Sequence, residues 1–80
     1  MRIPRDVDAS ALIKLLERYG YSVIRQTGSH VRLCKVFGDN EQHSITVPNH
    51  QPIKIGTLGS IVKDVAFANG LDPKELYDQL

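Results

Sequence analysis

The first quarter of the chain carries apolar residues at the spacing of one helix face. These residues follow the i, i+3, i+4, i+7 pattern and are Leu12, Leu15, Leu16 and Tyr19. The pattern predicts an amphipathic helix over roughly residues 9–19. Asp8 stands at the expected N-cap, and Gly20 stands where a helix often ends in the left-handed conformation. The first predicted element is therefore a helix that buries one apolar side.

The next part of the chain alternates between β-rich runs and turn residues. The runs are residues 21–26, 30–36 and about 43–47, and the turns between them are residues 27–29 and 38–41. Short runs at this spacing are typical of antiparallel strands joined by tight connections. Pro48 ends the third run, because proline lacks the N–H that a continuing strand would need. The pattern predicts a three-stranded antiparallel meander.

Two further helices are predicted after the loop of residues 49–56. The apolar positions of the longer one are Leu58, Ile61, Val62 and Val65. Its expected N-cap is Thr57, and it is expected to close near residues 69–70. Asp72, Pro73 and Glu75 then form a start signal for a short last helix that carries Leu76 and Leu80. In that signal the aspartate caps, the proline takes the first helical position and the glutamate completes a capping box.

This order predicts an α+β fold in one domain over residues 1–80, because 80 residues with 41% apolar content build a single core. With two amphipathic helices and one small sheet, both helices are expected on one sheet face, and the other face stays open. Side chains alternate along residues 30–36. If Val31 and Leu33 point into the core, His30 and Arg32 face outward together.

Composition and charge narrow the class of protein. A single cysteine, Cys34, excludes a disulfide-stapled scaffold and a cysteine zinc cage, and no run of about 18 apolar residues predicts a membrane helix. We expect a soluble protein of a reducing cytoplasm. The net charge of +1 hides nine basic against five acidic groups in residues 1–63, and one against four in residues 64–80. The basic part is either an ordinary solvated surface or a surface that faces an anion.

Among the three histidines, His30 has the setting of a presented group. It follows Gly28 and Ser29, where glycine permits a left-handed turn, and the strand then holds the imidazole beside Arg32. His50 lies in a loop between two prolines and is either a capping or a surface residue. His43 starts the third strand with no evident partner. Their separations of 13 and 7 residues match no metal-ligand spacing, so no metal site is predicted.

Phosphate chemistry needs few groups, and this chain has them. Cleavage of RNA by its own 2′-hydroxyl requires a proton acceptor, a proton donor and a cation or amide near the phosphate. His30 with Arg32, Lys54 or backbone amides is chemically sufficient. Lys54 precedes the second long helix, whose free N–H groups favour an anion. The equally weighted alternative is that Gly56 and Thr57 only start a helix, since every helix start offers such amides.

Four segments in order carry a resemblance to a known family. They are Leu-Leu-Glu-Arg-Tyr-Gly-Tyr at 15–21, Arg-Gln-Thr-Gly-Ser-His at 25–30, Val-Pro-Asn-His at 47–50 and Gly-Thr-Leu-Gly-Ser-Ile at 56–61. With them, the sequence resembles the HicA-type (YcfA-like) toxins of bacterial toxin–antitoxin pairs, a family of mRNA interferases. The resemblance covers nearly the whole chain. The sequence departs from the family pattern in a longer stretch between Lys35 and His43 and in an N-terminal extension at residues 5–8. These departures affect the expected substrate contacts and not the expected fold.

The resemblance implies a fold similar to a double-stranded RNA-binding domain and cleavage of mRNA without a metal or other cofactor. It implies that His30 is the catalytic residue, that Gly28 and Ser29 present it, and that a HicB-like antitoxin covers it. His50 matches a recurrent position with no assigned role. The candidate substrate-binding residues are Gly28, Ser29, Arg32, His50 and Lys54.

Two alternatives remain, namely a non-catalytic RNA-binding module of the same architecture and a small adaptor whose open sheet face docks a protein. Modules that bind duplex RNA usually carry a lysine cluster at a helix start, whereas this helix start has only Lys54 and Lys63. The side chains available for phosphate contact are Arg25, Arg32, Lys35 and Lys54. About two to four contacts follow, so RNA binding is expected to be weak and salt-sensitive.

Overall fold

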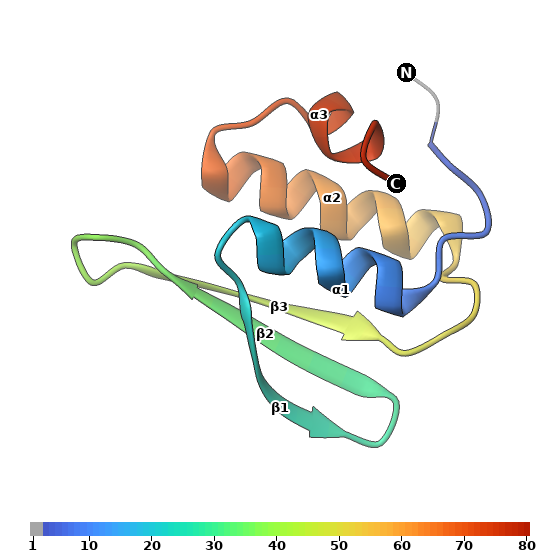
Figure 1. Cartoon of the computed structure of the whole chain (residues 1–80), viewed down its shortest axis with the longest axis horizontal. Coiled ribbons are helices and arrows are strands. Elements are labelled where there is room, and N and C mark those ends of the chain that lie inside the picture. Colours follow the sequence, from blue (N-terminus) through green and yellow to red (C-terminus); the bar gives the residue numbers. More distant parts are fainter. Residues whose placement is uncertain (1–2) are drawn as a thin grey trace.

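The computed structural model describes residues 3–80 and has the predicted order of elements (Figure 1). Met1 and Arg2, which the predicted domain 1–80 includes, lie outside the described residues. The helices are α1 (Ala9–Arg18), α2 (Ile55–Asn69) and α3 (Pro73–Tyr77), and the strands are β1 (Ser22–Thr27), β2 (His30–Val36) and β3 (Gln42–Pro48). The strands pair antiparallel in the order β1-β2-β3. The predicted α+β fold is confirmed.

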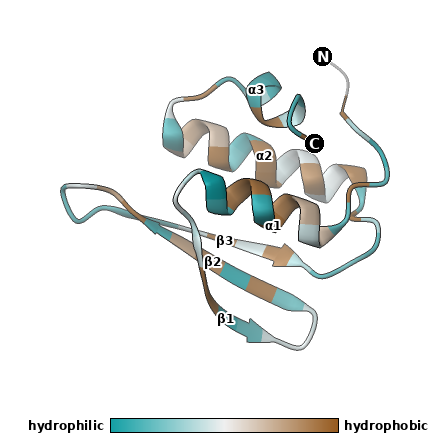
Figure 2. Ribbon diagram, viewed as in Figure 1, coloured by the Kyte–Doolittle hydropathy of each residue, from teal (hydrophilic) through white to brown (hydrophobic). Residues whose placement is uncertain are grey.

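The helices cover one face of the sheet and leave the other face open (Figure 1). Figure 2 shows apolar and polar residues alternating along α1 and β2, which gives each element one apolar side. These sides meet in a core, whose largest fully buried side chains are Leu12, Leu15, Leu16, Leu33, Leu58, Leu76, Val47, Val62 and Val65. Because burial of apolar surface is the dominant favourable term in folding, this core holds both long helices on the predicted face.

Alternation along β2 sorts its side chains between the core and the open face. Val31 and Leu33 are buried, whereas His30 and Arg32 are exposed. The predicted orientation is therefore confirmed, since burying two alternate apolar residues turns their neighbours outward. All residues of β1 are exposed, because this edge strand runs clear of the helices (Figure 1).

The start of α1 depends on a backbone contact and not on the predicted side-chain cap. Asp8 occupies the N-cap position, but its side chain makes no capping hydrogen bond. Instead, the N–H of Ala9 donates to the carbonyl oxygen of His50 at 3.2 Å. At the other end Gly20 has φ +96°, a left-handed conformation that glycine adopts without a steric cost. The predicted helix end is confirmed.

The start of α2 differs from the predicted one. The cap at Thr57 is wrong, because the helix begins at Ile55 with Lys54 at its N-cap and no side-chain capping bond. Ile53 is buried, and its N–H donates to the carbonyl oxygen of Val7 at 2.8 Å. This contact fixes the chain to the core before it reaches Thr57, and the N-cap lies three residues earlier than the predicted one.

The start of α3 agrees with the sequence signal. The Asp72 side chain accepts a hydrogen bond from the N–H of Lys74 at 3.0 Å, and Pro73 takes the first helical position. The predicted capping box is not formed, because no hydrogen bond of the Glu75 side chain is found within residues 3–80; only its backbone N–H donates, to the carbonyl oxygen of Asp72 at 2.9 Å. Between α2 and α3, Gly70 adopts the left-handed conformation with φ +66° and ends α2 near the predicted position.

A chain of polar side chains ties the sheet to α2 on the helix-covered side. Asn69 donates to the Tyr21 hydroxyl at 3.1 Å, that hydroxyl lies 2.6 Å from Nδ1 of His43, and Nε2 of His43 lies 3.1 Å from a carboxylate oxygen of Asp64. Lys35 donates to Asn69. The expectation that His43 has no partner is therefore wrong. Its partners lie 22 and 21 residues away along the chain, so no local pattern could show them.

Candidate functional site

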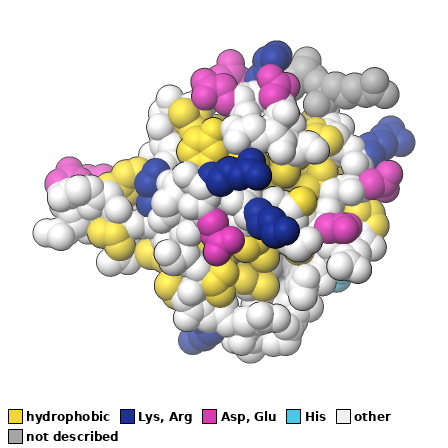
Figure 3. Space-filling model, in the orientation of Figure 1, with side chains coloured by type: hydrophobic (Ala, Val, Ile, Leu, Met, Phe, Trp, Pro, Cys, Tyr) yellow, Lys and Arg dark blue, Asp and Glu magenta, His cyan; other side chains and the backbone are white. Residues whose placement is uncertain are grey.

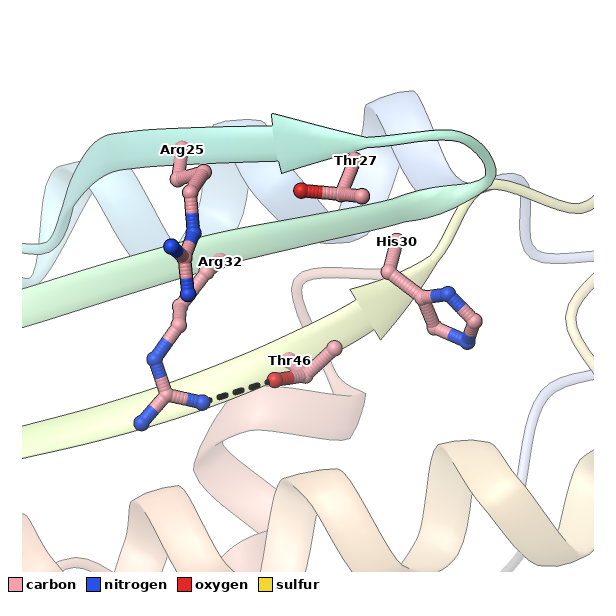
Figure 4. Close-up of a pocket in the computed structure, with 5 residues that line it drawn as sticks. All are labelled: Arg25, Thr27, His30, Arg32 and Thr46. Atoms are coloured by element: carbon pink, nitrogen blue, oxygen red, sulfur yellow. Dashed lines mark hydrogen bonds between the residues drawn. The ribbon is translucent and has the colours of Figure 1, made fainter.

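A pocket of about 300 Å³ opens on the sheet face that the helices leave uncovered. The residues that line it come from all three strands and are Arg25, Thr27, His30, Arg32 and Thr46 (Figure 4). Two arginines and a histidine thus share a hollow with two hydroxyl groups. No carboxylate lies among these lining residues, so the pocket offers positive charge and hydrogen-bond donors to an anion.

The register of the strands explains why these five side chains meet. His30 pairs with Thr27 across β1 and β2, and Arg32 pairs with Arg25 on one side and with Thr46 on the other. Directly paired residues of neighbouring strands point to the same face. Moving two residues along a strand keeps the face and shifts the position by about 7 Å. The arginine row therefore lies beside the row that holds the histidine.

The hydrogen bonds in the pocket distinguish its two arginines. Nη1 of Arg32 donates to the Thr46 hydroxyl at 3.0 Å, which holds this guanidinium over β3 (Figure 4). Within residues 3–80 the ion pairs join His43 to Asp64 and Lys74 to Asp78, and none includes a pocket arginine. Both positive charges are thus without a protein counter-charge in the part of the chain that the structure describes.

The turn before His30 is fixed by the loop that follows β3. Gly28 is left-handed with φ +57°, and a Cβ atom there would meet nothing within 4 Å, so the backbone angle and not space selects glycine. The carbonyl oxygen of Ser29 accepts from the N–H of Asn49 at 2.6 Å. This bond anchors the turn, and the exposed imidazole of His30 therefore projects from a defined position.

Only two of the six candidate site residues line the pocket. His30 and Arg32 do, and Gly28 and Ser29 form the turn next to it. His50 contributes its carbonyl oxygen to the start of α1, and Lys54 stands at the N-cap of α2; neither lines the pocket.

The six candidate site residues leave out three that line the pocket, namely Arg25, Thr27 and Thr46, although Arg25 was predicted as a phosphate contact. The first two belong to the segment 25–30 that carried the resemblance, which is a signal that could have found them. Thr46 gives no such signal, because only the pairing of β2 with β3 brings it to Arg32.

Lys35 does not belong to this face. Its ammonium group donates to Asn69 and lies 4.9 Å from the centre of the Phe37 ring, as part of the polar chain behind the sheet. The prediction that Lys35 contacts phosphate is wrong, because residues two apart along a strand share a face and Lys35 therefore lies on the core side with Leu33.

The order Asp64, His43 and Tyr21 has the hydrogen-bond pattern of a relay that activates a hydroxyl nucleophile. The chemistry does not follow, because Tyr21 is 2% exposed and no substrate can reach its oxygen. Burial also raises the pKa of Tyr21 above its ordinary value, which opposes formation of the phenolate. These residues therefore stabilise the fold and leave the open-face pocket as the candidate site.

Surface charge over the helices is mixed, with lysine or arginine next to aspartate or glutamate (Figure 3). In residues 3–80 no group of three histidine, cysteine, aspartate or glutamate side chains is arranged to hold a metal ion. Across the same residues, no helix has the length and apolar character needed to cross a membrane. The pocket on the open sheet face is the feature that combines exposure, positive charge and a titratable group.

Comparison with known families matches the greater part of the chain. A family model described as HicA toxin of bacterial toxin-antitoxin matches residues 9–66, a stretch that contains the three strands and all the residues lining the pocket. No curated protein and no solved structure matches.

Proposed function

The chain belongs to the HicA toxin family of bacterial toxin–antitoxin systems, and on this premise we propose that it is an endoribonuclease that cleaves mRNA. The observation that carries the proposal is the exposed His30 in a pocket with two arginines that have no acidic partner within residues 3–80. Toxins of this kind act on targets inside the cell that makes them. We therefore assign the activity to the cytoplasm, where mRNA is found.

The reaction that fits this pocket is attack of a 2′-hydroxyl on the neighbouring phosphodiester. The 2′-oxygen bonds to phosphorus as the bond from phosphorus to the 5′-oxygen breaks, which leaves a 2′,3′-cyclic phosphate and a free 5′-hydroxyl. Neutral His30 accepts the proton of the 2′-hydroxyl, and the imidazolium returns a proton to the departing 5′-oxygen. An imidazole can both accept and donate a proton, so one side chain can serve both roles.

The remaining candidate residues have supporting roles in this proposal. Arg32 binds the phosphate, because a guanidinium offers several N–H donors to its oxygens. Gly28 and Ser29 form the turn that presents His30, and their backbone approaches the RNA without a bulky side chain. His50 and Lys54 lie outside the pocket and contact the RNA chain further from the bond that is cut. None of these steps uses a metal ion, so cleavage is expected to persist in EDTA.

The family implies an antitoxin partner, since its members are toxins of toxin–antitoxin systems. We propose that this partner is HicB-like and covers the open sheet face around His30. A stable protein complex buries about 800 Å² on each partner, so an antitoxin of this kind would extend over the open face well beyond the pocket. An antitoxin bound there blocks the pocket from RNA.

The second candidate function is a non-catalytic RNA-binding module, and the α2 start bears on it. Modules that bind duplex RNA place several lysines at such a helix start. Here Lys54 stands at the N-cap and no basic residue follows until Lys63. This sparse charge favours the nuclease over the binding module.

The test compares the wild-type chain with His30→Ala on a long mRNA in EDTA, with cleavage and retention of RNA measured separately. Cleavage by the wild type and intact RNA with the variant support the nuclease. Retention of RNA by both proteins without any cleavage identifies the binding module. If the chain neither cleaves nor retains RNA, the remaining alternative is the small adaptor, whose open sheet face docks only a protein.

A further inference from the structure

Arg25 and Arg32 are paired directly opposite each other on β1 and β2. Like charges in such a pair repel and destabilise a sheet. Within residues 3–80 no carboxylate forms an ion pair with either arginine, so the protein itself does not offset the repulsion. An anion bound between the two guanidinium groups would offset it. The pair therefore indicates an anionic ligand at this point of the sheet.

A bulge in β1 brings Arg25 to this face. Val23 pairs with Leu33 and Arg25 pairs with Arg32, so Ile24 is an extra residue with no partner on β2. Without the bulge Ile24 would face Arg32, and Arg25 would lie on the side of the helices. Ile24 is 58% exposed, like the rest of this exposed edge strand, so the bulge buries no apolar side chain at this position. Bulges that redirect a side chain in this way are frequent next to active sites.

The two arginines differ in how they are held. Arg32 is fixed by its bond to the Thr46 hydroxyl, whereas no hydrogen bond of the Arg25 side chain is found among the described residues (Figure 4). A fixed guanidinium suits binding of a phosphate that does not change. A guanidinium without a fixed partner can follow the phosphate oxygens as phosphorus passes from four to five oxygen ligands during the attack.

From these observations we propose that Arg25 is a catalytic residue, and that it and Arg32 clamp the phosphodiester that is cut. Arg25 donates to a non-bridging oxygen on which negative charge grows in the transition state. Arg32 binds the phosphate equally in the ground state and the transition state. The assignment rests on the proposed nuclease function. Donors aimed at developing charge lower the barrier, whereas uniform binding changes KM.

The first experiment measures kcat and KM for a synthetic RNA whose cleavage site has been mapped. Arg25→Gln is expected to lower kcat about 10²-fold with little change in KM, as loss of one transition-state donor does in other enzymes. Arg32→Gln is expected mainly to raise KM. The matched control is Arg18→Gln, which removes the same charge from the exposed end of α1, outside the pocket, and should leave kcat unchanged.

A sulfur substitution separates direct contact from a structural effect. Replacing a non-bridging oxygen at the cleaved phosphate by sulfur should slow the wild type and add little further loss in Arg25→Gln, because the contact is already absent there. Equal sulfur effects in the wild type and Arg25→Gln overturn the catalytic role. The catalytic role is also overturned if the kcat of Arg25→Gln equals that of Arg18→Gln while His30→Ala is inactive. That result would leave the nuclease function intact.

Titration with inorganic phosphate, followed by NMR of the arginine side-chain Nε–H signals, tests the anion site without any cleavage. The signals of Arg25 and Arg32 should shift together, and that of Arg18 should stay in place. If the wild type leaves RNA intact, the nuclease function and the catalytic role both fail, and the titration still shows whether the pair holds an anion. Absence of a shift in both pocket arginines overturns the clamp itself.

Discussion

The N–H of Asn49 donates to the carbonyl oxygen of Ser29 at 2.6 Å and extends the pairing of β2 with β3 beyond the pair of His30 and Pro48. The turn that precedes His30 is thereby joined to the loop that carries His50. The Gly-Ser-His and Val-Pro-Asn-His segments, separate in the sequence, form one unit in the structure. The position of the proposed catalytic imidazole depends on this unit.

Asn49→Pro tests that dependence, because proline has no N–H to donate. Loss of the bond should free the turn and lower RNA cleavage about tenfold, with a loss of stability of about 1 kcal/mol. Cleavage assays and thermal unfolding measure the two effects. Asn49→Ala keeps the N–H and is the matched control, expected near the wild type. A similar loss of cleavage in both variants would assign the effect to the amide side chain instead.

His30→Ala should separate chemistry from folding. The side chain is exposed, so its truncation should cost on the order of 1 kcal/mol or less. Loss of the proton-transfer group should lower cleavage about 10²- to 10⁴-fold. Affinity for RNA should change little, since the arginines supply the phosphate contacts.

Cleavage, growth arrest and circular dichroism of the purified variant check this prediction. His50→Ala is compared in parallel, because the His50 side chain lies outside the pocket and its removal should cost less than tenfold. A folded His30→Ala that still arrests growth would contradict the catalytic assignment and favour the binding module.

His43→Ala should have the opposite outcome, with stability lost and chemistry kept. The substitution leaves the buried Tyr21 hydroxyl without its 2.6 Å partner and removes the contact with Asp64. Asn69 still donates to the Tyr21 oxygen, so the group left unpaired is the buried O–H donor, at a cost of about 1–3 kcal/mol. In a chain of this size each kcal/mol lowers Tm by about 4–8 °C.

Thermal unfolding of His43→Ala measures the loss, with Asp64→Asn as the control. The amide oxygen of asparagine still accepts a hydrogen bond from Nε2, so this variant should lose less stability. Cleavage per folded molecule should equal the wild type in both. A His43→Ala protein that unfolds at the wild-type temperature would show that the network adds nothing to the fold.

The sequence predicts those features that depend on neighbouring residues. Alternation of Val31 and Leu33 with His30 and Arg32 predicted the open-face pair correctly, because a strand has a fixed period of two. The signal of Asp72 and Pro73 likewise located α3, since a capping contact spans only two residues.

Features that depend on distant pairing could not be predicted in this way. The bulge at Ile24 exists only relative to β2, and it decides on which face Arg25 lies. The predicted start of α2 was wrong because the backbone contact between Ile53 and Val7 holds the chain just before the helix. These two residues lie far apart in the sequence, so no local pattern shows the contact. The sequence singled out His30 from its turn, whereas the position of Arg25 opposite Arg32 depends on the register of β1 and β2.

Tyr77→Phe should stabilise the protein, most clearly in alkali. The Tyr77 hydroxyl is buried and has no hydrogen-bond partner among the described residues, and burial raises the pKa of Tyr77 above its ordinary value. The stability that this tyrosine contributes through its proton is fully present below the unfolded-state pKa of about 10. It is lost as pH rises from there through the higher folded-state pKa, because the unfolded state releases the proton first.

Urea unfolding at pH 7 and at about pH 11 checks both parts of this prediction. Removal of an unpaired buried hydroxyl should raise stability at pH 7 by about 1 kcal/mol. The fall in stability between the two pH values should be smaller than in the wild type. Tyr19→Phe is the control, because the Tyr19 hydroxyl accepts from Gln79 at 2.7 Å at the surface. A steeper alkaline fall in Tyr77→Phe would contradict the sign of this pKa shift.

The salt dependence of RNA binding should report about three phosphate contacts. Arg25, Arg32 and Lys54 are exposed and free of ion pairs within residues 3–80, whereas Lys35 is engaged behind the sheet. Each contact to single-stranded RNA contributes about 0.7 to the slope of log K against log salt, so a slope near −2 is expected.

Affinities of the cleavage-deficient His30→Ala chain, measured between about 50 and 300 mM salt, give this slope. Adding Arg32→Ala should make it shallower by about 0.7, because one phosphate contact is lost. Adding Lys35→Ala should leave the slope unchanged, since its ammonium group bonds to Asn69 and stacks near Phe37. If Lys35→Ala and Arg32→Ala make the slope shallower by the same amount, RNA would have to contact both faces of β2. The helices cover one of these faces, so this result would refute the open-face site.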